Sequence, residues 1–286
     1  MKKLNLKYHF WMMGILGMLL NSCSTSYKTV SESNGAKKIY NLKYGEDSRN
    51  IMDVFLPANH TNESHVVMLV HGGAWIMGNK AHLRSIQKFL FKNDIPSVSI
   101  NYRLLKKDVN YQTQEEDINK AVETTLKSAS EWNLNTKKII LLGESAGGHL
   151  ALLYGFHHAD QISKLISLSG PTDFYSDHYL KSSYHQKTKG IFQRVVGEKY
   201  SPENLESFKK ASPLHEVSNV PTLIFQGDRD FLVNRKQGIS LDSVMTAKNF
   251  PHEFIYMKNS GHVPRFVKKK RENIIFPAIL KFIKTE

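Results

Sequence analysis

The chain has 286 residues, of which 41% are apolar and 23% are charged, and it contains one cysteine. A chain of this length buries a substantial core and is commonly a single domain. A single cysteine excludes an internal disulfide and a cysteine-based metal cluster. The formal net charge of +13 is compatible with an anionic partner.

Residues 1–22 have the layout of a signal peptide. Three lysines, at positions 2, 3 and 7, precede an apolar run from Phe10 to Leu20. As a helix this run would rise about 16 Å, whereas the hydrocarbon core of a bilayer is roughly 30 Å thick. The segment is therefore predicted to be an export signal and not a membrane-spanning anchor.

Cys23 follows this leader in the sequence Leu-Asn-Ser-Cys, which resembles a bacterial lipobox with Asn21 in place of the more usual small residue. In a lipobox the cysteine is lipidated and becomes the mature N-terminus. The alternative is an ordinary cleaved signal with an incidental cysteine. Residues 23–37 are rich in Ser, Thr, Lys and Asn and are expected to form a flexible tether. The protein is thus expected to be exported and held by a lipid anchor on the periplasmic, outer-membrane or cell-surface side.

Short apolar segments then alternate with longer amphipathic ones, which predicts an α/β fold with a mostly parallel central sheet and helices on both faces over residues 38–286. An antiparallel edge hairpin is expected over residues 30–56. Strands are expected over 66–70, 97–101, 138–142, 165–168, 222–225 and 253–257. Helices are expected over 82–92, 114–132, 147–157 and 235–246.

Residues 173–212 interrupt this alternation. They separate two expected strands, carry many Tyr, Lys and His residues, and are too numerous for a plain connection. We expect a small helical insertion that lies over the active site like a lid.

The chain ends in an expected helix that carries its densest basic cluster, residues 268–271. Because three of the 39 basic residues lie in the leader, its removal leaves a net charge of about +10. The other basic residues are scattered, so a solvated helix face is the favoured interpretation. Attraction to anionic lipid head groups or acidic polysaccharide is the alternative, and nucleic acid is not an expected partner of an exported protein. The apolar positions of this helix are Phe266, Ile274, Ile275, Ile279 and Ile283.

In such a sheet, reactive groups gather in the loops that follow the carboxyl ends of the strands. The first of these loops, residues 71–75, reads His-Gly-Gly-Ala-Trp. Small residues let the backbone N–H groups of Gly73 and Ala74 approach an oxygen that becomes negatively charged, and Gly72 belongs to the same loop. We predict an oxyanion hole here, and an ordinary glycine turn is the alternative.

The second loop, residues 143–147, reads Gly-Glu-Ser-Ala-Gly between the expected strand 138–142 and the expected helix 147–157. This strand–turn–helix context is the one that a nucleophile elbow requires. The sequence therefore predicts Ser145 as the nucleophile and the N–H of Ala146 as a further oxyanion donor. A tight turn with a capping serine is the alternative.

The third loop, residues 226–230, offers Asp228 and Asp230. The acid of a catalytic triad lies buried beside the histidine and offsets the charge of the imidazolium. We favour Asp230, which lies further into the loop, and leave Asp228 to cap the loop or form a salt bridge.

His262 is selected as the general base from among 13 histidines because it follows the last expected strand. The order serine, aspartate, histidine is the one that this elbow fold uses. His252 precedes the same strand and so lies at its opposite end. His149, His157 and His158 lie on the helix after the elbow and are expected to pack or to face solvent. The sequence shows no spacing of histidines and carboxylates typical of a metal site.

With these motifs, residues 50–263 resemble the hormone-sensitive-lipase-like and carbohydrate-esterase branches of the α/β-hydrolase superfamily. The likeness is strongest to acetyl-xylan and feruloyl esterases of the BD-FAE type, some of which are lipid-anchored in bacteria. It implies an α/β-hydrolase fold and structural roles for Arg103 and Asp117. Glu144 departs from the aspartate or histidine often found at its position, which leaves the subfamily open. The likeness rests on Met-Asp-Val at 52–54, His-Gly-Gly at 71–73, Asn-Tyr-Arg-Leu at 101–104, Asp117, Gly-Glu-Ser-Ala-Gly-Gly at 143–148 and Ser-Pro-Leu at 212–214.

The sequence thus predicts a serine esterase without a cofactor that acts on small-molecule or carbohydrate esters, for example short acyl, acetylated or feruloylated ones. His262 would accept the proton of Ser145 as an acyl-enzyme forms, with Asp230 orienting the imidazole. Two alternatives remain open: an amide hydrolase, such as a formamidase or peptidase, and a non-catalytic binding lipoprotein.

Overall fold

The computed structural model describes residues 27–134 and 137–285. The predictions for the leader and for Cys23 lie outside the described residues. Within the described ranges, no helix is both long and apolar enough to cross a membrane.

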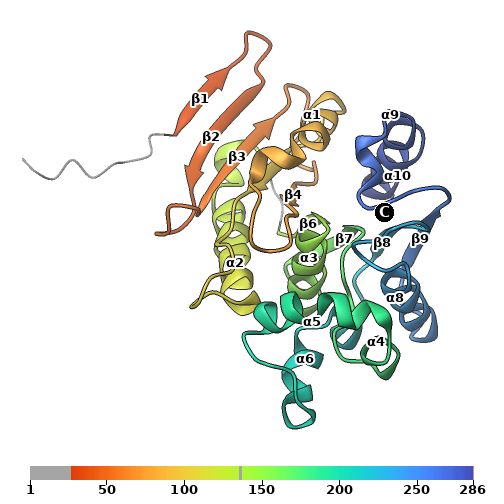
Figure 1. Cartoon of the computed structure of the whole chain (residues 1–286). Coiled ribbons are helices and arrows are strands. Elements are labelled where there is room, and N and C mark those ends of the chain that lie inside the picture. Colours follow the sequence, from red (N-terminus) through yellow and green to blue (C-terminus); the bar gives the residue numbers. More distant parts are fainter. Residues whose placement is uncertain (1–26, 135–136, 286) are drawn as a thin grey trace, which may run out of the picture.

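A nine-stranded sheet forms the centre of the molecule, with the strand order β1-β2-β3-β5-β4-β6-β7-β8-β9 (Figure 1). The first three strands and β5 pair antiparallel, and β5, β4 and β6 to β9 pair parallel. The strands are β1 Lys28–Ser31, β2 Lys37–Lys43, β3 Ile51–Leu56, β4 Val67–Val70, β5 Ser97–Ile100, β6 Ile139–Glu144, β7 Ile162–Leu168, β8 Thr222–Gly227 and β9 His252–Met257. All six strands expected between residues 66 and 257 are present, which confirms the mostly parallel sheet.

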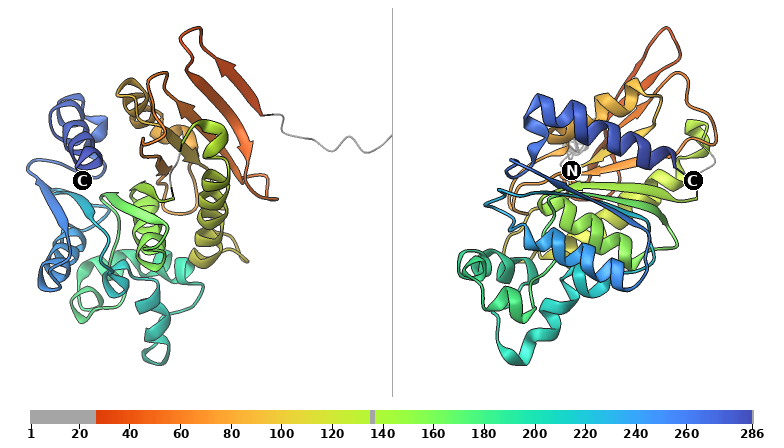
Figure 2. Two further views of the ribbon diagram at one scale, coloured as in Figure 1. Left: turned by 180° about the vertical axis from the view of Figure 1, so that it is seen from behind. Right: turned by 90° about the vertical axis from the view of Figure 1, so that its right-hand side faces the viewer.

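Helices cover both faces of this sheet (Figure 2). The period-2 geometry of β4 explains why: Val67 and Leu69 belong to one buried cluster, and Met68 and Val70 belong to the other. The first cluster includes residues of α1 Arg84–Lys92 and α10 Phe276–Lys284. The second includes residues of α2 Tyr111–Lys127, α3 Ala146–His157 and α8 Lys236–Ala247. Two apolar layers therefore hold a sheet that is buried on both faces.

The N-terminal edge corrects the flexible tether expected over residues 23–37. Lys28–Ser31 forms β1 and pairs antiparallel with β2, so the fold begins before residue 38. Thr29 and Val30 are β-branched and suit a strand. The turn that follows is closed by the Glu32 N–H donating to Ala36 O at 2.8 Å. Three antiparallel strands thus stand where one hairpin was expected.

The segment 173–212 is helical, as expected, and lies beside α3 and α8 in the ribbon views (Figures 1 and 2). Its largest helix, α5 Ser183–Val196, buries Tyr184 and Phe192. Tyr184 also donates a hydrogen bond to Leu232 O at 3.0 Å, which ties the insertion to the loop after β8. The remaining helices of this part of the chain are α4 Asp177–Leu180, η3 Pro202–Asn204, α6 Leu205–Lys210 and α7 Pro213–Glu216.

The C-terminal helix is broken into shorter pieces. Ile275, Ile279 and Ile283 are buried as expected, but Phe266 is 74% exposed. Phe266 ends a 3-10 turn before the helix begins, so it lies off the apolar stripe of α10. The pieces are η4 Pro264–Phe266, α9 Lys268–Lys270, the π-turn η5 Arg271–Ile275 and α10.

Candidate active site

Ser145 occupies the sharp turn between β6, which ends at Glu144, and α3, which begins at Ala146. Its backbone has a positive φ of 53° with ψ −121°, a combination outside the allowed regions for a non-glycine residue. A Cβ on Gly147 would lie 2.1 Å from Val70 O, so only glycine lets α3 approach β4 this closely. The turn therefore raises the Ser145 side chain above the sheet at the carboxyl end of β6.

His262 and Asp230 meet Ser145 in one hydrogen-bonded row. His262 Nε2 lies 2.9 Å from Ser145 Oγ, and His262 Nδ1 lies 2.8 Å from Asp230 Oδ2. The Asp230 carboxylate is inaccessible to solvent and also accepts the backbone N–H groups of Leu232 at 3.0 Å and Val233 at 2.8 Å. A buried carboxylate held in this way keeps the Nδ1 proton of the imidazole in place and leaves Nε2 free to accept a proton.

Asp228, the other acid of this loop, points elsewhere. Its Oδ1 accepts the backbone N–H of Ser260 at 3.0 Å, which links the loop after β8 to the loop that carries His262. Hydrogen bonds from backbone N–H groups of that loop hold the pKa of Asp228 below its usual range. The structure thus brings Asp230, and not Asp228, to the histidine.

The glycine-rich loop after β4 and Ser145 line one cavity, and the loop lies opposite the serine. Gly73 has φ 123°, and Ala74 and Trp75 have φ 49° and 62°. The carbonyl of Gly73 accepts the N–H groups of Ile76 at 3.1 Å and Met77 at 3.0 Å. Within the described residues, the N–H groups of Gly73, Ala74 and Ala146 donate to no other residue. They are therefore available to an oxygen bound beside Ser145.

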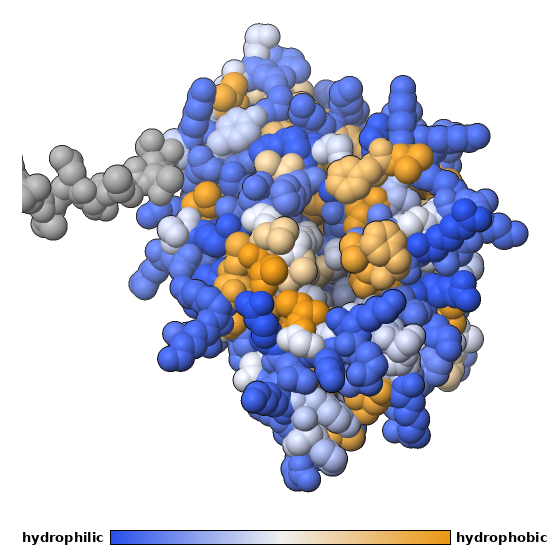
Figure 3. All heavy atoms as spheres, in the orientation of Figure 1, coloured by the Kyte–Doolittle hydropathy of each residue, from blue (hydrophilic) through white to orange (hydrophobic). Residues whose placement is uncertain are grey.

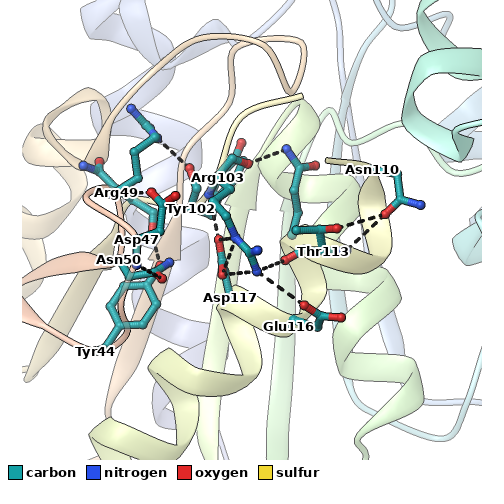
Figure 4. A network of polar contacts seen from close by, with 12 residues as sticks. Tyr44, Asp47, Arg49, Asn50, Tyr102, Arg103, Asn110, Thr113, Glu116 and Asp117 are labelled. Carbon is teal, nitrogen blue, oxygen red and sulfur yellow. Dashed lines mark hydrogen bonds and ion pairs between the residues drawn. The ribbon is translucent and has the colours of Figure 1, made fainter. Parts of the chain in front are cut away.

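A buried network that the sequence did not reveal supports this loop. Tyr102 stacks on the His71 ring at 4.3 Å and donates its hydroxyl hydrogen to His71 O at 2.7 Å. Arg49 donates to Tyr102 O at 2.7 Å and to Gly78 O at 2.8 Å. Burial lowers the pKa of His71 to about 3, so the ring is neutral and accepts from Arg49 through Nε2. Figure 4 shows Arg49 reaching the Tyr102 backbone.

Arg103 and Asp117 form the neighbouring part of the same network (Figure 4). Asp117 accepts Arg103 Nη2 at 2.7 Å, Arg103 Nε at 2.9 Å and the Arg103 backbone N–H at 2.8 Å. Neither side chain lines the active-site cavity. The pair fixes the segment after β5 to α2, in agreement with the structural role that the resemblance implied.

The other histidines singled out in the sequence lie outside the hydrogen-bonded row of Ser145, His262 and Asp230. His149 is buried, accepts Trp75 Nε1–H at 3.2 Å through Nδ1, and lies 2.8 Å from Ala211 O through Nε2. Burial lowers its pKa to about 4. His157 contacts Glu115, His158 stacks on Tyr154, and His252 contacts Asp242. In the described part of the chain, no group of three or more His, Cys, Asp or Glu residues could hold a metal ion.

Ser145 and His262 open into a cavity of about 770 Å³. Its walls are mainly apolar and come from the loop after β4, from α5 and from the loops after β8 and β9. Leu232 and Phe266 are largely exposed at this cavity, and Figure 3 shows hydrophobic residues on both sides of a hollow in the face seen in Figure 1. The apolar and aromatic wall residues are Ala74, Trp75, Met77, Pro171, Tyr184, Ile191, Phe192, Leu232, Val233, Val263 and Phe266.

Two charged residues of the cavity wall, Glu144 and Arg265, were not predicted to interact. Arg265 donates through Nε and Nη2 to the two carboxylate oxygens of Glu144. The two residues are 121 positions apart. No local sequence signal links residues that far apart. In the sequence, Glu144 stood out only as a departure from the usual motif.

Comparison with known proteins agrees with this architecture. The model of the BD-FAE family matches residues 52–245. A relative from Arabidopsis thaliana, isoprenylcysteine alpha-carbonyl methylesterase, is 24% identical over 79% of this chain and 56% of its own length. A probable carboxylic ester hydrolase of Mycobacterium tuberculosis, LipM, is 27% identical over 68% of this chain and 49% of its own length. The chain thus spans about half the length of the curated relatives it matches.

Solved structures share the fold. A truncated carbohydrate esterase from gut microbiota superposes with a TM-score of 0.75 at 21% identity, covering 90% of this chain and 100% of that chain. Esterase B from Lactobacillus rhamnosis gives a TM-score of 0.71 at 15% identity, covering 90% of this chain and 88% of that chain. At these identities the likeness establishes a shared fold.

Proposed function

The chain belongs to the BD-FAE family, and on that premise we propose that it is a serine carboxylesterase. The observation that carries this proposal is the row from Ser145 Oγ through the His262 ring to Asp230, with contacts of 2.9 and 2.8 Å. A serine hydroxyl is a weak nucleophile until an adjacent base accepts its proton. In this row the base is in contact with the hydroxyl, and a buried acid orients the base.

The proposed reaction has two halves. His262 Nε2 accepts the Ser145 proton as Oγ attacks the ester carbonyl, and then delivers that proton to the departing alcohol. Water then attacks the acyl-enzyme while His262 accepts one of its protons. The C–Oγ bond breaks, His262 returns that proton to Oγ, and the carboxylic acid is released with both residues back in their starting state. The N–H groups of Gly73, Ala74 and Ala146 stabilise the oxyanion in both halves, and no cofactor takes part.

The substrate is proposed to be a neutral ester, such as a short acyl ester or an acetylated or feruloylated carbohydrate. The largely apolar wall of the cavity supports an uncharged substrate, because its two ionised residues, Glu144 and Arg265, already satisfy each other. The relatives named as esterases support the ester bond as the target.

We further propose that the protein is exported and attached to a membrane through a lipid on Cys23. The motif at residues 20–23 supports this proposal. Metabolic labelling with a clickable fatty acid in a bacterial host tests it. The wild-type chain is expected to be labelled and membrane-bound, and the Cys23→Ser chain is expected to be unlabelled; equal labelling of both would contradict the anchor.

A matched ester and amide test the proposed activity. Purified protein is expected to hydrolyse p-nitrophenyl acetate and to leave p-nitroacetanilide unchanged. A preference for the anilide would favour the amide hydrolase, and no hydrolysis of either would favour the binding lipoprotein. A panel of acetyl, butyryl, dodecanoyl and feruloyl esters, with acetylated xylan, then defines the acyl group. Preference for chains beyond about eight carbons would indicate a lipase in place of a short-chain esterase.

A further inference from the structure

Glu144 and Arg265 form a buried ion pair between the two segments that carry the reacting residues. Glu144 immediately precedes Ser145 at the end of β6, and Arg265 lies three residues after His262. The side chains are only 7% and 6% exposed, and the Arg265 Nη2–Glu144 Oε1 distance is 2.9 Å. Two parallel hydrogen bonds of this type fix orientation as well as distance.

Both segments have strained backbones next to the pair. Ser145 has φ 53°, and Val263 has φ 50° and ψ 65°. A β-branched residue such as valine is an uncommon occupant of the left-handed region, and such strain persists only where surrounding contacts hold it. Arg265 supplies such contacts for the segment that contains Val263. Its guanidinium pairs with Glu144 and lies 4.3 Å from the centre of the Phe266 ring. The ion pair is therefore a direct link between the Ser145 turn and the His262 loop.

The charges of the pair also act on the cavity, because Glu144 and Arg265 both line it together with Ser145 and His262. A lone carboxylate here would oppose the negative charge that develops on the ester oxygen. A lone guanidinium would oppose the positive charge that develops on the imidazole. Paired, the two charges largely cancel at the reacting atoms.

We propose that Glu144 and Arg265 are a positioning pair for the reaction, which holds the base against the nucleophile and keeps the cavity electrically balanced. This inference rests on the proposed esterase function. The titratable and charged groups near His262 are Asp230, which contacts its Nδ1 from the buried side, and Glu144, Arg265, His82 and Tyr184, which line the cavity. The pair acts, in this proposal, by placing Ser145 and His262 and by the charge it presents to them.

The pH profile of kcat/KM separates this role from a purely structural one. In Arg265→Gln the Glu144 carboxylate is left unpaired and stabilises the imidazolium, so the acidic limb of the profile moves to higher pH by about half to one unit. In Glu144→Gln the guanidinium is left unpaired, and the limb moves to lower pH by a similar amount. The double variant returns the limb towards the wild-type position. In each single variant kcat is expected to fall about 10- to 100-fold with KM changed less than threefold.

Arg265→Lys separates charge from geometry. A lysine keeps the positive charge but cannot make the two parallel hydrogen bonds. We expect its acidic limb at the wild-type position and a reduced kcat. The matched control is Arg103→Gln, which breaks a bidentate pair outside the cavity; it is expected to lower the unfolding temperature and leave the limb unmoved.

Thermal unfolding measures whether each variant is folded. The fraction of Ser145 labelled by a fluorophosphonate probe measures how many molecules have an assembled active site. Opposite limb shifts in folded variants support the positioning pair. Unmoved limbs in all variants, or a loss of kcat that tracks only the loss of folded protein, would overturn it. A wild-type enzyme that hydrolyses no ester would instead overturn the proposed function, and with it the role of the pair.

Discussion

His262 Nε2 lies 2.9 Å from Ser145 Oγ although 117 residues separate them along the chain. The two side chains come from loops at the carboxyl ends of β9 and β6, which the parallel sheet brings to one edge. Asp230, from the loop after β8, completes the row on the far side of the imidazole.

Replacing each of the two acids of the loop after β8 is expected to lower kcat by very different amounts. Asp230→Asn removes the carboxylate that holds the Nδ1 proton of His262, so kcat should fall by roughly 10⁴-fold. Asp228→Asn keeps an oxygen for the Ser260 N–H, so kcat should stay within about tenfold of wild type. Steady-state kinetics with p-nitrophenyl acetate measure both. Equal losses in the two variants would rule out the assignment of Asp230 as the acid of the row.

Gly73→Ala is expected to disturb the oxyanion loop. The added Cβ would lie 2.2 Å from Met77 O, at a residue whose φ of 123° disfavours any side chain. The displaced N–H should cost kcat roughly 10²- to 10³-fold. The control is Gly35→Ala, because Gly35 also has a positive φ but has nothing within 4 Å of its added Cβ and lies far along the chain in the β1–β2 turn. The oxyanion assignment fails if Gly73→Ala loses stability but keeps the wild-type kcat.

His149 is expected to make the fold sensitive to acid. Its pKa is lowered by burial to about 4 in the folded protein, whereas in the unfolded chain it lies near the usual value of about 6.5. Above pH 6.5 both states are neutral and the full stability is present. As the pH falls from about 6.5 to about 4 the unfolded chain binds the proton first, so stability is lost, by an amount on the order of 3 kcal/mol.

His149→Gln removes this titration while its amide can still accept from Trp75 and donate to Ala211 O. Urea unfolding at pH 7 and pH 4.5 should therefore show a smaller difference in the free energy of unfolding for the variant than for wild type. Identical differences in the two proteins would show that His149 is not the group responsible.

The Arg103–Asp117 pair is expected to stabilise the fold and not the reaction. Asp117→Ala leaves Arg103 without its buried partner and should lower the free energy of unfolding by about 3 kcal/mol. The matched control is Glu123→Ala, which breaks the exposed pair with Lys127 and should cost less than about 1 kcal/mol. Urea unfolding measures both, and a cost for Asp117→Ala no larger than for Glu123→Ala would contradict the structural role.

Much of this arrangement was predictable from the sequence because it depends on local patterns. The apolar segments that became β4 to β9 and the glycines around Ser145 are local signals, and the order of the loops follows from the parallel sheet. Asp230 could be preferred to Asp228 only by its place in the loop. The structure adds the backbone hydrogen bonds that turn Asp230 inward and Asp228 towards Ser260.

The remaining features depend on contacts between distant residues. The Glu144–Arg265 pair joins two ends of the site that no sequence period relates, and Phe266 looked like a core position only because its spacing continued the apolar stripe of the last helix. Lys28–Ser31 was assigned to a tether by its composition, but the open edge of β2 supplies the backbone partners that make it a strand. For Lys28–Ser31 a tertiary contact overrides a local preference.

The central claim is that Ser145 is the nucleophile of an ester hydrolase, and replacing its hydroxyl tests this claim most directly. Purified Ser145→Ala should keep the wild-type unfolding temperature and lose at least roughly 10⁴-fold in kcat on p-nitrophenyl acetate, because no other group of the row can form the acyl-enzyme. A folded Ser145→Ala protein that hydrolyses this ester as fast as wild type would contradict the account.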